Sequence, residues 1–203
     1  MTAMTELLAD PNDFLHRQQE RIKAPNTKIA ASMIVKRYAK VYLDEVMDGL
    51  VFASEFPVVS LEACRFTEEL NLIVDEAQVR TVDSRREAWR GVFSEHLTPV
   101  VDSLHKATRL PLIILWENIA VRMNSYLRKA VQKNPDQAWM VQEVAAELRE
   151  REGDVFGLER NPLAEYLAPC EALTTQVMRK TCCYYHKLQK EKELPYCLVC
   201  PVQ

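Results

Sequence analysis

The chain has 203 residues, 48% of them apolar and 27% charged, and its formal net charge is −3. A chain of this length can bury a sizeable core. Its slightly acidic balance argues against nucleic acid as a partner, because phosphate binding usually needs a basic stripe. The longest apolar run, residues 110–116, is much shorter than the roughly 20 residues that span a bilayer. The first residues also lack the pattern of a secretory signal. We therefore expect a cytoplasmic protein with at most peripheral membrane association.

The first quarter of the sequence predicts two helices. Residues 12–23 show a short amphipathic pattern, which should end near Pro25 because the residue before a proline avoids helical geometry. Asn26 can cap a second, longer helix, and Gly49 offers its stop.

A small β element is expected next. Residues 57–66 and 69–79 are rich in valine and isoleucine and partly alternate between apolar and polar side chains. This texture predicts a pairing of two strands.

The remaining signals are helical. Residues 84–110 predict one kinked helix or two short ones, with Pro99 at the break. Helices are also expected over residues 111–133 and 136–152, and one or two more over residues 161–180. The predicted fold is therefore α+β and predominantly helical.

We expect one domain over residues 1–203, with a small antiparallel β element and a C-terminal cysteine segment at 181–203. The four glycines form neither a GxGxxG nor a GxxxxGK[ST] pattern. A usual dinucleotide or nucleoside-triphosphate loop is thus not expected.

Four of the six cysteines lie close to the C-terminus, as an adjacent pair, 13 intervening residues and then a C-x-x-C: Cys182, Cys183, Cys197 and Cys200. In a reducing cytosol such clusters bind metal or do redox work more often than they form disulfides. A C-x-x-C loop brings two thiolates to one metal at low backbone cost, which is why it recurs in zinc and iron sites.

The adjacent pair bears on the kind of metal site. Neighbouring side chains diverge along a regular helix or strand, so both can ligate only where the backbone is irregular or the site is wide. A [2Fe–2S] rhomb is wider than a zinc ion, which favours a two-iron cluster. A structural four-thiolate zinc site and a tail of regulatory thiols remain alternatives. Cys64 and Cys170 stand alone in apolar surroundings, and we interpret them as small buried hydrophobes.

Cations outnumber carboxylates around the cysteines. Residues 179–192 contain only Glu191 as an acidic residue, against five basic ones: Arg179, Lys180, Lys187, Lys190 and Lys192. Positive charge near an iron–sulfur cluster raises its reduction potential. The same charge could attract an anionic chelate.

The cysteine pattern resembles that of the FhuF-like ferric-siderophore reductases, which carry a vicinal Cys-Cys followed by a C-x-x-C near the C-terminus. Two upstream stretches agree, "ASMIVKRYA" at 31–39 and "LWENIA" at 115–120. The fold of this family is similar to the C-terminal lobe of aerobactin-type siderophore synthetases. Two features depart from the family pattern. The interval between the cysteine pairs is longer, and Glu117 stands where the family has glycine.

The resemblance implies a [2Fe–2S] cluster held by the four C-terminal cysteines and a one-electron reduction of siderophore-bound Fe(III). Fe(II) is larger and less charged, so hard oxygen donors release it. A ferredoxin or a flavin-dependent reductase would supply the electron. Because the chain lacks a broad basic face, we favour a hydroxamate or citrate-hydroxamate chelate over a catecholate.

Seven residues are candidates for contact with the chelate or the cluster: Lys36, Arg37, Trp116, Asn118, Arg179, Lys180 and His186. Trp116 lies on an apolar helix, which favours a place in the core. Two rival functions are a helical binding module closed by structural zinc and an iron–sulfur redox sensor.

Overall fold

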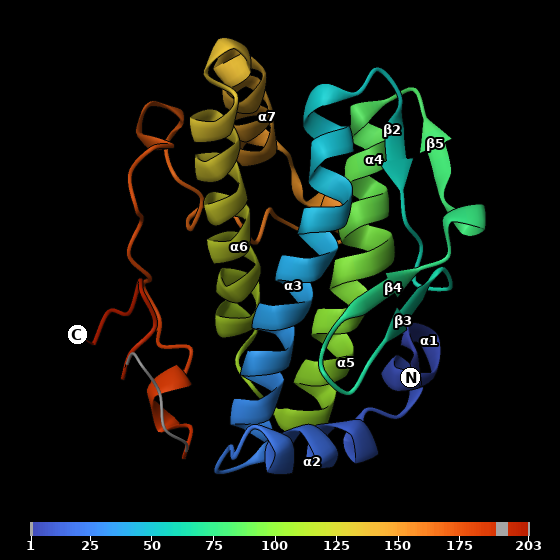
Figure 1. Cartoon of the computed structure of the whole chain (residues 1–203), viewed down its shortest axis with the longest axis vertical. Helices are drawn as coiled ribbons and strands as arrows, with labels where there is room; N and C mark the ends of the chain where they lie inside the picture. Colours follow the sequence, from blue (N-terminus) through green and yellow to red (C-terminus); the bar gives the residue numbers. More distant parts are fainter. Residues whose placement is uncertain (1, 190–194, 203) are drawn as a thin grey trace.

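A computed structural model describes residues 2–189 and 195–202. The fold is α+β and mostly helical, as predicted (Figure 1). The α-helices are α1 (Met4–Ala9), α2 (Asn12–Arg21), α3 (Thr27–Phe52), α4 (Arg85–Val92), α5 (Thr98–Thr108), α6 (Leu112–Lys133) and α7 (Ala138–Glu150). The strands are β1 (Thr2–Ala3), β2 (Phe56–Val58), β3 (Cys64–Phe66), β4 (Leu72–Val74) and β5 (Arg80–Val82).

Helix α3 runs through the middle of the molecule. The side chain of Asn26 accepts a hydrogen bond from the backbone N–H of Ile29 at 3.0 Å, which confirms the predicted cap. The helix does not stop near Gly49 but continues to Phe52. Gly49 instead allows a close approach, because a Cβ there would lie 2.4 Å from the Cγ of Pro57.

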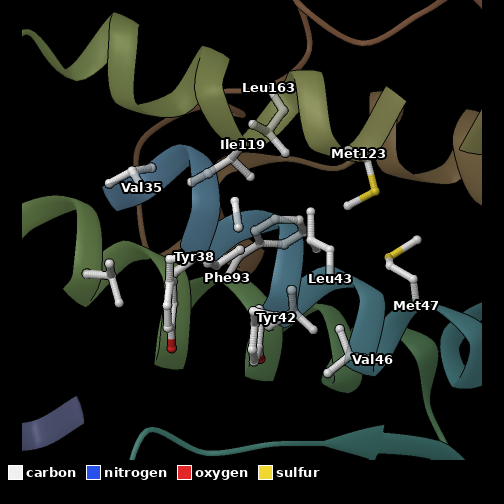
Figure 2. Packing of buried hydrophobic residues seen from close by; sticks show 14 of the residues in the cluster. Val35, Tyr38, Tyr42, Leu43, Val46, Met47, Phe93, Ile119, Met123 and Leu163 are labelled. Atoms are coloured by element: carbon white, nitrogen blue, oxygen red, sulfur yellow. The ribbon is translucent and has the colours of Figure 1, made fainter. Parts of the chain in front are cut away.

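The core forms where α3 packs against α6 and the α4–α5 arm. Figure 2 shows Tyr38, Tyr42 and Leu43 of α3 among side chains from other elements, including Phe93 and Ile119. Buried apolar residues cover more than one face of α3, while Asp44, Glu45 and Asp48 stay exposed.

Helices α4 and α5 are joined without a break at Pro99. A π-helical turn, Phe93–Leu97, lies one turn earlier and carries the irregularity. Pro99 falls in the first turn of α5, where its missing N–H is tolerated.

Two small sheets cover one side of the helices. Strands β3 and β4 pair antiparallel, with Cys64 opposite Val74, which confirms the predicted pairing. Strand β1 adds to this sheet, while β2 and β5 form a second antiparallel pair. These additional strands have two or three residues each, too few to show an alternating pattern.

The expected helices over residues 161–180 are wrong. This segment is irregular except for a 3₁₀ turn, Cys170–Ala172. Asn124 of α6 holds its backbone from both sides, since its Nδ2 donates to the carbonyl of Tyr166 and its Oδ1 accepts from the N–H of Ala168, each at 2.8 Å. Hydrogen bonds to another element here replace those of a helix.

Candidate metal centre

The cysteine segment lies against the helices that form the core. After the irregular stretch, the chain runs beside α6 and reaches one end of α3, as the orange-to-red trace shows (Figure 1). Residues of the 3₁₀ turn Tyr185–Lys187 contact α3. The four cysteines are thus presented beside two long, well-packed helices.

A buried carboxylate on α6 anchors the start of this segment. Glu117 is 1% exposed and accepts hydrogen bonds from the backbone N–H groups of Lys180 (2.5 Å) and Thr181 (3.0 Å). The hydroxyl of Thr181 donates to the same carboxylate. The guanidinium of Arg179 completes the set at 3.2 Å. A charged side chain is almost never fully buried unless it is paired, and here Glu117 is paired with the tail.

A second chain of hydrogen bonds reaches the cysteines themselves. Arg179 Nη1 donates to Asn118 Oδ1 at 2.8 Å, and Asn118 Nδ2 donates to the carbonyl and the hydroxyl of Ser32, both at 3.1 Å. The Ser32 hydroxyl donates to the carbonyl of Cys183 at 2.9 Å. All four residues are buried. This network therefore fixes the backbone of Cys183 relative to α3 and α6.

Three of the four C-terminal cysteines gather in one buried cluster, Cys183, Cys197 and Cys200. The sulfurs of Cys183 and Cys197 lie 3.6 Å apart, although 13 residues separate them in sequence. Cys200 follows in a turn closed by its N–H to the carbonyl of Cys197 at 3.1 Å. Cys197 and Cys200 thus lie in one compact turn, as a C-x-x-C spacing predicts.

Cys182 is half-buried and lies outside this buried cluster. Its sulfur lies 3.6 Å from Nδ1 of His186 and accepts the N–H of Tyr184 at 3.3 Å. The two adjacent cysteines lie in irregular backbone, followed by Tyr184 with a left-handed φ of +63°. The condition that the vicinal pair requires, an irregular backbone, is met.

The surroundings favour a thiolate at Cys183. A hydrogen bond with the thiol of Cys197 lowers the pKa of Cys183, and the positive charges of Lys36 and Arg179 act in the same direction. The ammonium of Lys36 lies 3.6 Å from the sulfur. The same hydrogen bond raises the pKa of Cys197, while burial raises that of Cys182.

The other candidate residues divide into two groups. Arg179, Asn118, Lys36 and His186 lie within the network or beside the sulfurs. The remaining three do not reach the thiols through any hydrogen bond or ion pair seen in the described residues: Arg37 donates to Leu70 and Asn71, Lys180 pairs with exposed Glu165, and Trp116 packs against Phe156. Trp116 is a core residue, as its helix pattern favours.

The two isolated cysteines lie apart from the cluster. Cys64 is fully buried in β3, and burial raises its pKa to about 12, so it remains a thiol. Cys170 is half-buried and packs against the core. The interpretation of Cys64 as a buried hydrophobe is confirmed, and Cys170 is only partly covered.

The donor set consists of soft sulfur ligands, which suit zinc or an iron–sulfur cluster. In the described part of the chain, no three His, Cys, Asp or Glu side chains converge closely enough to hold a single metal ion. Three cysteines in one buried cluster, two of them with sulfurs 3.6 Å apart, and a fourth adjacent in sequence fit such a group on donor chemistry.

Sequence reasoning missed the role of Glu117, Ser32 and Arg122. Glu117 was noted only as a departure from a family glycine, yet a carboxylate within the apolar run 112–120 is itself a signal of a buried partner. Ser32 carries no signal in the sequence. Arg122, whose Nε donates to the carbonyl of Lys36 at 3.0 Å, lies beside the cluster and looks in sequence like an ordinary helix charge.

Comparison with known families identifies the helical body of the molecule. The family described as "Ferric iron reductase FhuF-like transporter" matches residues 37–174, more than half of the chain. The chain belongs to this FhuF-like ferric iron reductase family. The resemblance seen in the motifs is thereby confirmed, and ferric-iron handling is the general function that the family indicates. No curated protein matches the chain.

The family match does not include the cysteine segment. The match begins at Arg37 and ends before all four C-terminal cysteines, so the geometry of the cysteine segment is an observation independent of the family match. Among the described residues, no helix has the length and apolar character needed to cross a membrane.

Proposed function

We propose that this protein is a cytoplasmic ferric-siderophore reductase whose [2Fe–2S] cluster is held by Cys182, Cys183, Cys197 and Cys200. One observation carries the proposal: the irregular tail of a FhuF-like body brings three buried thiols together and leaves the fourth beside them. The chelate iron gains one electron and becomes Fe(II), while a ferredoxin or a flavin-dependent reductase loses one. Oxygen donors then release the iron without cleavage of the siderophore.

The bound cluster would supply a one-electron carrier. The chain's own residues hold its ligands in place and shield them from water. Lys36 and Arg179 stabilise the negative charge of the thiolates. Side chains packed around the thiols, Met33, Tyr185, Tyr196 and Val199, reduce the access of solvent. Positive charge and partial burial both affect the reduction potential.

The first test is the visible spectrum of the purified protein. Cys197→Ser should lose the visible charge-transfer bands and most of the bound iron, because a serine hydroxyl replaces a buried thiolate ligand. Cys170→Ser is the matched control. It changes a half-buried cysteine outside the cluster and should keep both the bands and the iron. Iron content and absorbance before and after dithionite measure the outcome.

The rival functions predict different results. A colourless protein that contains one zinc per chain and no iron would overturn the proposal in favour of a structural zinc module. A coloured protein whose reduced form does not reduce ferric chelates, as followed with a ferrous trap such as ferrozine, would instead indicate a redox sensor.

A further inference from the structure

Two cavities lie beside the cysteine cluster and share part of their wall. The first measures about 220 Å³ and reaches Cys197, while the second measures about 370 Å³ and extends along α3. Lys36, Arg122 and Tyr185 line both. We name the two together the Lys36–Arg122 groove. Ligand pockets usually measure about 300–1,000 Å³, so the lobe next to Cys197 reaches this size only together with the second lobe.

The groove is strongly basic, although the chain as a whole is acidic. Its cations are Arg21, Lys36, Arg37, Lys40, Arg122 and Arg128. Among the described residues, the lobe next to Cys197 is lined by no carboxylate, and the second lobe by Glu69 alone. A concave site lined by one sign of charge concentrates ligands of the opposite sign. The chain lacks a broad basic face as judged from its net charge, yet basic residues gather at this site.

Among the described residues, neither Lys36 nor Arg122 forms an ion pair with a carboxylate, although the Lys36 ammonium also lies 3.6 Å from the Cys183 sulfur. Arg122 is half-buried, and its Nε donates to the carbonyl of Lys36 at 3.0 Å. The ammonium of Lys36 lies over the ring of Tyr185, 5.2 Å from its centroid. Burial of a guanidinium costs free energy unless an anion compensates it. A planar guanidinium also matches carboxylate geometry with two parallel hydrogen bonds.

The same groove offers apolar and aromatic surface. Tyr185, Tyr196, Val177 and Val199 line the lobe next to Cys197. Such walls suit the organic backbone of a chelator, and the cations suit its charged groups. The groove is therefore shaped for an amphipathic anion that lies against a proposed cluster ligand.

We propose that the Lys36–Arg122 groove binds the ferric chelate as an anion, and that it selects oxygen-donor chelates with carboxylates over neutral or cationic trihydroxamates. This inference rests on the proposed function and narrows its substrate class to the citrate-hydroxamate type. Arg122 contributes to both lobes, and Arg128 contributes to the lobe next to Cys197. Contact with that lobe would bring the chelated iron close to the protein's sulfur ligands.

Binding can be measured without electron transfer by using gallium(III), which replaces Fe(III) and is not reduced by biological donors. The cluster-loaded protein is titrated calorimetrically with two probes, the gallium complex of a citrate-dihydroxamate siderophore and that of desferrioxamine B. We expect the first to bind at least 10-fold more tightly at low salt. Raising the ionic strength should reduce this difference.

Arg122→Gln and Arg128→Gln should each weaken the citrate-type complex about 10-fold or more, since a charged hydrogen bond is lost. Both should change the desferrioxamine complex less than 3-fold. Lys129→Gln, an exposed neighbour on α6, is the control and should leave both affinities unchanged. Arg128→Gln also covers the case in which Arg122→Gln disturbs α3, because no hydrogen bond of Arg128 to the rest of the fold is seen among the described residues.

Failure of this inference differs from failure of the proposed function. If the wild type reduces ferric chelates while both arginine variants bind the citrate-type complex normally, the groove assignment is overturned and the reductase function stands. If the protein holds no iron but binds the gallium complex through Arg122 and Arg128, the groove stands and the reductase function falls. Equal affinity for the two probes would overturn the stated selectivity.

Discussion

Replacing Glu117 by glutamine should release the cysteine segment from α6. The carboxylate accepts hydrogen bonds from the segment at Arg179, Lys180 and Thr181. The Arg179 side chain is 0% exposed, so the substitution leaves a buried charge without its counter-ion. Breaking one partner of a buried pair costs about 3–5 kcal/mol. A glutamine NH₂ would also face backbone N–H donors where the carboxylate offered acceptors.

The expected consequence is local opening of the segment. A cost of about 3 kcal/mol corresponds to roughly a 100-fold larger open population, since about 1.4 kcal/mol is a factor of ten. Trypsin should then cleave after Arg179 and Lys180 at least 100-fold faster than in the wild type. Iron content should fall as well, because Cys183 loses its fixed position.

Glu165→Gln is the matched control for Glu117→Gln. It removes a second carboxylate that pairs with this part of the chain, the partner of Lys180 at 3.7 Å, where both side chains are well exposed. Exposed ion pairs contribute about 0–1 kcal/mol, so proteolysis and iron content should stay at wild-type levels. The double variant Glu117→Gln/Arg179→Gln should recover part of the protection, because it removes the uncompensated charge. Wild-type resistance in Glu117→Gln would show that the buried carboxylate is not the anchor.

The sequence predicted those parts of the fold whose signals are local. Asn26 begins a helix because its side chain can cap the next turn, and the strands around Cys64 and Val74 pair across a short turn. The prediction of helices over residues 161–180 was wrong because Asn124, a residue about 40 positions away, fixes the backbone of this segment. Helix-forming composition could not compete with these long-range hydrogen bonds.

In the candidate site too, the sequence predicted features with local signals and missed those that depend on residues far apart in the chain. The four C-terminal cysteines were visible from their spacing alone, because thiols are the groups that hold soft metals. The residues that orient them were not visible, because Ser32 and Glu117 reach the segment from 151 and about 62 positions away. The basic groove was hidden for another reason. Its cations come from three separated elements, while the net charge of the chain is negative.

His96 should make the fold sensitive to mild acid. It lies in the π-helical turn, fully buried, where its Nδ1 donates to the carbonyl of Val59 at 2.8 Å. Its Nε2 then accepts from the hydroxyl of Tyr38 at 2.5 Å. The hydrogen bond from Tyr38 requires the neutral ring, because a protonated Nε2 has no lone pair to accept it. Burial lowers the pKa of His96 to about 3, compared with about 6.5 in an unfolded chain.

Between these two values only the unfolded state binds the proton, so the free energy of unfolding falls as the pH falls below about 6.5. The slope is about 1.4 kcal/mol per pH unit for one group. The contribution of His96 is complete above pH 6.5 and decreases continuously towards pH 3. Urea unfolding followed by tryptophan fluorescence between pH 7 and pH 5 isolates it, because most carboxylates titrate below this range.

His96→Gln separates the histidine from all other titrating groups. An amide can donate to the carbonyl of Val59 and accept from Tyr38, but it does not titrate. The variant should therefore lose about 1–2 kcal/mol less than the wild type between pH 6.5 and pH 5. His16→Gln changes an exposed histidine and should keep the wild-type slope. Parallel curves for the wild type and His96→Gln would mean that His96 already carries its proton in the folded protein. The π-helical turn would then hold an imidazolium rather than the neutral ring that the hydrogen bond from Tyr38 requires.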